Sequence, residues 1–79
     1  MFKKIKIKDK AGLTSIFIIP TDEIAWVQYK ALPDLHDHNL QLNVAFKGDI
    51  ANMTAWDDNA RSIYRQLSPM LVESKKKIE

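Results

Sequence analysis

The stretch Asn39-Leu40-Gln41-Leu42-Asn43-Val44-Ala45-Phe46-Lys47 decides the fold class of this chain. Its large apolar side chains recur at every second position, whereas the positions between them are mostly polar. This period of two predicts a β-strand with one face on a core and the other face in water. A register slip of one residue would exchange the two faces, so the pattern also constrains how the strand pairs.

Four further segments read as strands around it. Residues 4–8 alternate lysine with isoleucine, which predicts a half-buried strand whose lysines face water. Residues 13–19 are rich in β-branched and aromatic side chains on both faces, so we expect a central strand covered on both sides. Residues 24–30 and 50–53 complete the set, and Gly12 marks a turn that needs a positive φ.

A helix is predicted after the last strand. Thr54-Ala55-Trp56-Asp57 fits the capping-box pattern, so we expect the helix to begin at Thr54. Pro69 should end it near Leu67. The apolar residues that follow fall on one helical stripe, which we expect to pack on the apolar face of residues 39–47: Trp56, Ala60, Ile63, Tyr64, Leu67 and Leu71.

The predicted fold class is α+β, a small antiparallel β-meander of four to five strands with one C-terminal amphipathic helix on the sheet. A chain of 79 residues makes one domain at most and excludes Rossmann domains and (β/α)₈ barrels. We assign residues 1–73 to this domain and residues 74–79 to a frayed basic tail.

The composition also bears on location. The sequence has no cysteine, which excludes disulfides, thiolate zinc sites and a cysteine nucleophile. A small domain without disulfides favours a reducing compartment, so we expect a cytoplasmic protein. No apolar run approaches the roughly 20 residues of a membrane helix, and no apolar segment follows Lys3 and Lys4 as it would in a signal peptide.

The charge is unevenly distributed, although the net charge is only +2. Lysines crowd the N-terminal segment, and Phe2 shares their register, which is compatible with a strand face that binds nucleic acid. Exposed lysines on an edge strand also prevent aggregation, and this is the simpler interpretation. The residues of the nucleic-acid alternative are Lys4, Lys6, Lys8 and Lys10.

The loop at residues 31–38 holds both histidines of the chain, His36 and His38, next to Asp34 and Asp37. Imidazole and carboxylate both bind divalent ions, so a metal-dependent function is one alternative, and acid–base catalysis is another. A solvated polar loop explains the same residues. We therefore predict no metal, no cofactor and no enzymatic activity.

Protein–protein contact is the function we expect from the sequence. One helix cannot cover both faces of a five-stranded sheet, so an apolar face should remain for a partner, most simply a second copy in a homodimer. We assign this interface to Phe17, Ile19 and Trp26. The interpretation is a small non-enzymatic binding or regulatory module, such as an accessory or inhibitor protein of a bacterium or phage.

Overall fold

The computed structural model describes residues 1–8, 11–34, 37–71 and 75–78. The helical elements are the 3₁₀ turn η1 (Thr21–Glu23), the helix α1 (Asp57–Leu67) and the 3₁₀ turn η2 (Ser68–Met70). The strands are β1 (Phe2–Lys8), β2 (Thr14–Pro20), β3 (Ile24–Ala31), β4 (Leu40–Phe46), β5 (Met53–Trp56) and β6 (Lys76–Ile78).

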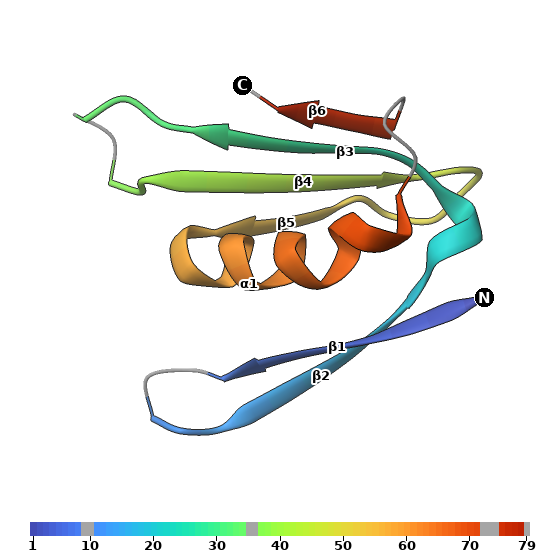
Figure 1. The fold of residues 1–79 in the computed structure, drawn as a ribbon, viewed down its shortest axis with the longest axis horizontal. Helices are drawn as coiled ribbons and strands as arrows, with labels where there is room; N and C mark the ends of the chain where they lie inside the picture. Colours follow the sequence, from blue (N-terminus) through green and yellow to red (C-terminus); the bar gives the residue numbers. More distant parts are fainter. Residues whose placement is uncertain (9–10, 35–36, 72–74, 79) are drawn as a thin grey trace.

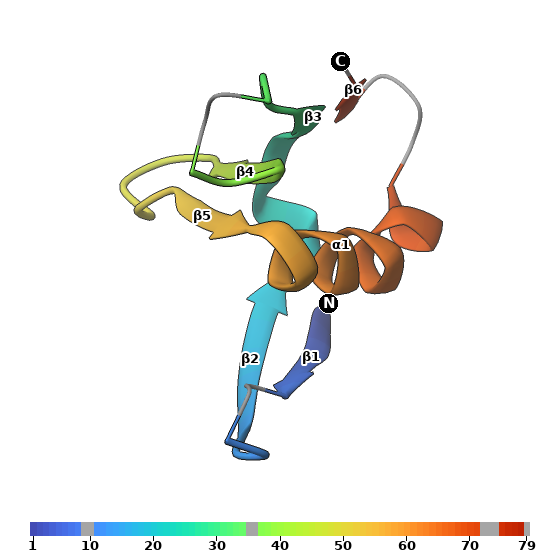
Figure 2. The same ribbon diagram turned by 90° about the vertical axis from the view of Figure 1, so that its left-hand side faces the viewer.

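The strands form two separate sheets with the helix between them. β1 and β2 make an antiparallel hairpin, and the other four strands form a sheet in the order β5-β4-β3-β6. Figures 1 and 2 show α1 lying between this sheet and the hairpin. The α+β class with a helix packed on antiparallel strands is thus confirmed, whereas the single meander is wrong. The hairpin covers the side of the helix that one sheet would have left open.

The core gathers residues from both sheets and the helix. Ile5 and Ile7 of β1 are buried, as their alternation with lysine predicts. Leu42 and Val44 of β4 are fully buried on the helix side of the sheet, and Leu67 is the fully buried end of the helical stripe. The remaining members of the cluster are Ile19, Ile24, Val27, Ala55, Ala60, Ile63 and Leu71. This packing confirms that the helix covers the apolar face of residues 39–47.

The outer face of the four-stranded sheet is polar. Asn43 donates from Nδ2 to Gln28 Oε1 at 3.1 Å and accepts from Thr54 Oγ1 at 3.0 Å, so a hydrogen-bonded row crosses three strands. Trp26 lies opposite Ala45, which is buried at 5% exposure. Hydrogen-bonded polar side chains thus cover part of this face, and the half-buried Trp26 lies on the same face.

The helix begins later than the capping box indicates. Residues 53–56 are strand β5, which replaces the predicted strand at 50–53, and α1 starts at Asp57. The Thr54 hydroxyl donates across the sheet to Asn43 and caps nothing, and Trp56 precedes the helix with 37% exposure. The end of the helix at Leu67, followed by a turn that contains Pro69, is as predicted.

The C-terminal segment differs from the predicted frayed tail. Lys76–Ile78 form β6, which pairs in parallel with β3 along Val27–Tyr29. Backbone pairing explains how a segment with three consecutive lysines is ordered, because ladder hydrogen bonds do not depend on the side chains. Residues 74 and 79 lie outside the described part of the chain.

Candidate functional site

The helix forms hydrogen bonds to one edge of the β1–β2 hairpin, the edge of β1. Gln66 of α1 donates from Nε2 to the Lys6 carbonyl oxygen at 3.0 Å and accepts from the Lys6 backbone N–H at Oε1 at 3.2 Å. The side-chain amide thus supplies the donor and the acceptor that a neighbouring strand would supply. Gln66 also contacts Ser62, one helical turn earlier, which fixes its orientation.

The same contacts fix the direction of the backbone groups on β2. In an antiparallel pair, opposite residues alternate between exchanging hydrogen bonds and pointing their N–H and C=O groups away from each other. Lys6 points away from β2, and its partner in the register is Ile16, which therefore points away from β1. The alternation places Thr14 and Ile18 in the same orientation as Ile16. In the described part of the chain, β1 is the only strand paired with β2.

Apolar side chains surround this open edge. Ile16 is 55% exposed, Ile18 is 64% exposed and Phe17 is 41% exposed, with Leu13 at 69% beside them. The prediction of a central strand covered on both sides is thus wrong, because β2 is an edge strand. Adjacent exposed apolar side chains make this edge a candidate interaction surface. We call Thr14–Ile18 and its outward backbone groups the β2 edge.

The structure separates the three residues assigned to an interface from sequence. Ile19 is 3% exposed and lies in the core, so it is not available to a partner. Trp26 is half-buried on the polar outer face of the other sheet. Phe17 remains accessible, and a cavity of about 220 Å³ opens beside it, lined also by Ile7, Met53, Thr54, Ala55, Trp56, Asn59 and Ile63.

The lysines lie where the alternation places them. Lys4, Lys6 and Lys8 are exposed on the outer face of the hairpin, and Phe2 is exposed at 69% in the same row. Lys4 lies opposite Ile18 and Lys6 opposite Ile16, so each lysine neighbours an isoleucine of the β2 edge. Lys10 lies outside the described residues.

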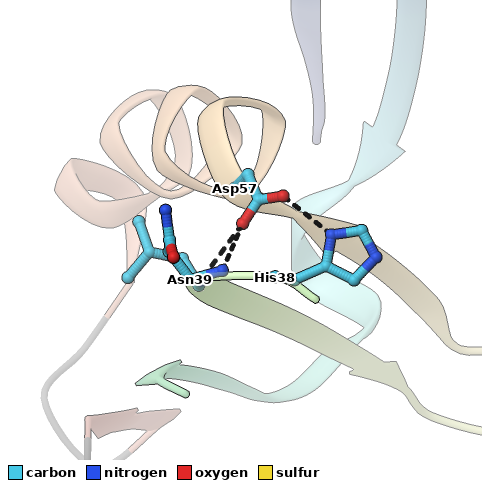
Figure 3. Close-up of polar contacts among 4 residues, drawn as sticks. His38, Asn39 and Asp57 are labelled. Carbon is cyan, nitrogen blue, oxygen red and sulfur yellow. Dashed lines mark hydrogen bonds and ion pairs between the residues drawn. The ribbon is translucent and has the colours of Figure 1, made fainter. Parts of the chain in front are cut away.

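His38 is held by a carboxylate that the sequence did not indicate. Its Nδ1 lies 2.7 Å from Asp57 Oδ2 (Figure 3). Its ring also stacks on Trp56, with the ring centroids 4.7 Å apart. Asp57 Oδ1 also accepts from the backbone N–H groups of Asn39 at 2.6 Å and Leu40 at 3.3 Å. Asp57, the first residue of α1, thus holds the start of β4 in place through hydrogen bonds.

These contacts determine the electrostatics of Asp57. The hydrogen bond from His38, followed by those from the backbone of Asn39 and Leu40, lowers the pKa of the Asp57 carboxyl below its ordinary value of 3.8. Asp57 adopts φ +52°, a left-handed conformation that aspartate tolerates better than most residues. Ionised Asp57 stabilises this junction through its hydrogen bonds.

The geometry gives the histidine a structural role. A cleft of about 510 Å³ adjoins it, lined by Lys8, His38, Asn39, Trp56, Asp57, Asp58 and Asn59, and no serine or threonine hydroxyl is among these residues. No group of three or more metal-ligating side chains occurs among the described residues. His36, the other histidine of the metal alternative, lies outside them. The arrangement orients the imidazole through Asp57 and Trp56.

Comparisons with protein-family models, with curated proteins and with solved structures found no match. Within the described residues, α1 is too short and too polar to cross a membrane. The β2 edge is therefore identified as a candidate site from the geometry of this chain alone.

Sequence reasoning missed two features of the site. Asp57 is 19 residues from His38, and no local pattern joins them. The contact of Gln66 with Lys6 is the second, because a polar residue on a helix does not indicate which backbone it will contact. By contrast, the sequence shows that β2 carries apolar residues on both faces, but it does not show that β2 lies at an edge.

Proposed function

We propose that this chain is a small binding module that acts through protein–protein contact, and that the β2 edge is its docking surface. The observation that carries the proposal is the difference between the two edges of the hairpin. Gln66 bonds to the outward backbone groups of Lys6 on β1, whereas β2 presents outward backbone groups among exposed apolar side chains. An edge of this kind accepts a further strand through main-chain hydrogen bonds.

The partner we propose is a second copy of the chain. An antiparallel edge is self-complementary, because two copies related by a two-fold axis present the same donors and acceptors to each other. The register that uses all three outward residues places Ile16 opposite Ile16 and Thr14 opposite Ile18. The alternative register, with Ile16 opposite Ile18, would place Pro20, which has no N–H, opposite Thr14 at both ends, so one hydrogen bond would be missing at each end.

Charge is compatible with this pairing. In the resulting strand order β1-β2-β2-β1, the two lysine rows are three inter-strand spacings apart, roughly 14 Å at about 4.8 Å each. This exceeds the Debye length of about 8 Å at physiological ionic strength, so their repulsion is largely screened. The isoleucines meet in the middle, where Ile16 and Ile18 of both copies form one apolar patch.

Sedimentation equilibrium of the wild-type chain and two variants tests the proposal. The wild-type chain should sediment as a dimer that dissociates on dilution. Ile16→Pro should be monomeric, because proline removes an outward N–H that β1 does not use and so leaves the hairpin paired. Ile16→Ala is the matched control, since it keeps that N–H and should dimerise more weakly. A monomeric wild type at millimolar concentration, or an Ile16→Pro dimer as tight as wild type, would contradict the proposal.

Single-stranded nucleic acid is the second candidate partner. The row of Lys4, Lys6 and Lys8 with exposed Phe2 favours it, because such a face combines cations for phosphates with a ring for stacking. Binding of an oligonucleotide through this row should weaken steeply with salt, whereas dimerisation through the β2 edge should not. Lys6→Gln should weaken oligonucleotide binding and leave the dimer intact.

The cysteine-free composition supports a cytoplasmic location for this non-enzymatic module. Separation of the cytoplasmic and membrane fractions of the native cells, followed by detection of the chain, tests this placement. Recovery of most of the protein with the membranes would contradict it.

A further inference from the structure

A second cleft lies between α1, β3 and β6, and the proposed docking surface does not use it. Its volume is about 390 Å³, within the range of small-ligand pockets in proteins. The described residues that line it are Tyr29, Arg61, Tyr64, Arg65, Ser68, Pro69 and Lys76. We call it the tyrosine cleft.

Two stacked rings form one wall of the tyrosine cleft. Tyr29 of β3 and Tyr64 of α1 lie with ring centroids 4.4 Å apart and planes 10° from parallel. Both side chains are half-buried and pack against the core, which holds the rings in place. A rigid aromatic surface next to a cavity favours a ligand with a planar ring, because every such ring has a face that can stack.

Three cationic side chains share the same cleft. Arg61 and Arg65 are one helical turn apart on α1, and Lys76 comes from β6. Like charges at this helical spacing destabilise an isolated helix, and the i,i+3 pair of Asp58 with Arg61 offsets this for Arg61 alone. Arg65 lies in the last turn of α1, where its charge offsets the negative end of the helix dipole. Arg61 and Lys76 lie outside that turn. No carboxylate is among the described residues that line the cleft. Asp58 Oδ1 lies 3.7 Å from Arg61 Nη1, but the Asp58 side chain is 96% exposed.

We infer that the tyrosine cleft binds a phosphate joined to an aromatic base, the chemistry of a nucleotide. The guanidinium groups of Arg61 and Arg65 match phosphate oxygens, and the stacked tyrosines supply a surface for the base. The ligand is a free mononucleotide or one unit of a single-stranded chain, which share this chemistry. The inference does not depend on pairing of the β2 edge.

Titration with adenosine 5′-monophosphate, followed by the ring signals of Tyr29 and Tyr64 in NMR spectra, tests the inference. Both rings should shift with the nucleotide, and adenosine and inorganic phosphate should each bind at least tenfold more weakly. Arg65→Gln should weaken nucleotide binding about tenfold, because it removes one charged contact to phosphate. Lys47→Gln is the matched control, since it removes the same charge from an exposed residue outside the cleft.

Equal affinity in Arg65→Gln and Lys47→Gln would overturn the inference, as would unshifted tyrosine signals at millimolar nucleotide. A short oligoadenylate measured in parallel distinguishes the two sources. If the oligomer binds more tightly than the mononucleotide and Arg65→Gln weakens both, the cleft takes one unit of a chain. If the oligomer gains nothing, the free nucleotide is the ligand.

Discussion

Replacement of Gln66 by alanine tests whether the helix holds the hairpin through its edge. The substitution removes two hydrogen bonds to the Lys6 backbone, at 3.0 Å and 3.2 Å. Each is worth about 0.5–1.5 kcal/mol, but both are solvent-exposed, and truncation also releases a side chain whose ordering opposes folding. The net loss should be about 1 kcal/mol, which lowers the melting temperature by about 4–8 °C in a domain of this size.

The assay is thermal and urea unfolding together with hydrogen exchange of the Lys6 amide. In Gln66→Ala this amide should exchange faster, because water replaces the glutamine oxygen. Arg61→Ala is the control, since it truncates a long polar side chain of the same helix whose ion pair is exposed and weak. If both variants unfold at the same temperature and Lys6 exchanges equally in both, the glutamine does not close the β1 edge.

Three further perturbations have defined outcomes. Leu67→Ala should lose about 2–5 kcal/mol in urea unfolding, as for other fully buried leucines; a loss under about 0.5 kcal/mol would mean that the stripe is not core. Asp57 contributes stability that is complete above its ordinary pKa of 3.8 and lost as pH falls through its lowered folded pKa. Asp57→Asn, which tolerates the same positive φ, should therefore flatten the acid limb of the stability curve; an unchanged limb would remove this role. Zn²⁺ should leave the melting temperature unchanged, and a stoichiometric rise abolished by His38→Ala would establish a metal site.

The sequence predicted those features that a repeating pattern encodes. Alternation placed Ile5 and Ile7 in the core and Lys4, Lys6 and Lys8 in water, as the structure shows. The stripe that ends at Leu67 likewise faces the sheet. Each pattern reports which face of an element is apolar, and burial follows from that when a complementary face is available.

The sequence patterns do not predict which strands pair or where the helix starts. β2 is apolar on both faces whether it lies in the centre or at an edge, so its composition could not reveal that β1 is its only described neighbour. The capping motif at Thr54 depends on neighbouring residues alone. In the structure the Thr54 hydroxyl instead donates a hydrogen bond to Asn43 on the adjacent strand. β6, with the sequence Lys76-Lys77-Ile78, pairs through its backbone, and its side chains show no strand pattern.

Exposed apolar side chains lie on β2, but mostly on the face opposite to the one that the sequence predicts. The sequence indicated an uncovered apolar surface, but it assigned that surface to the face of Phe17 and Ile19. The helix packs on this face and buries Ile19, so Ile16 and Ile18 on the opposite face are the exposed pair. Which face of an all-apolar strand meets the helix depends on tertiary packing, and alternation alone cannot decide it.

The central claim is that two copies pair through the β2 edge, and isotope-filtered NMR on a mixed labelled sample tests it most directly. In the proposed register Ser15 of one copy lies opposite Phe17 of the other in a non-hydrogen-bonded pair, where the Cα atoms approach to about 4.5 Å. The account predicts an intermolecular contact between the Hα atoms of Ser15 and Phe17, with the Ile16 amide protected from exchange only at concentrations that support the dimer. Absence of that contact, with the Ile16 amide exchanging freely at every concentration, would contradict it.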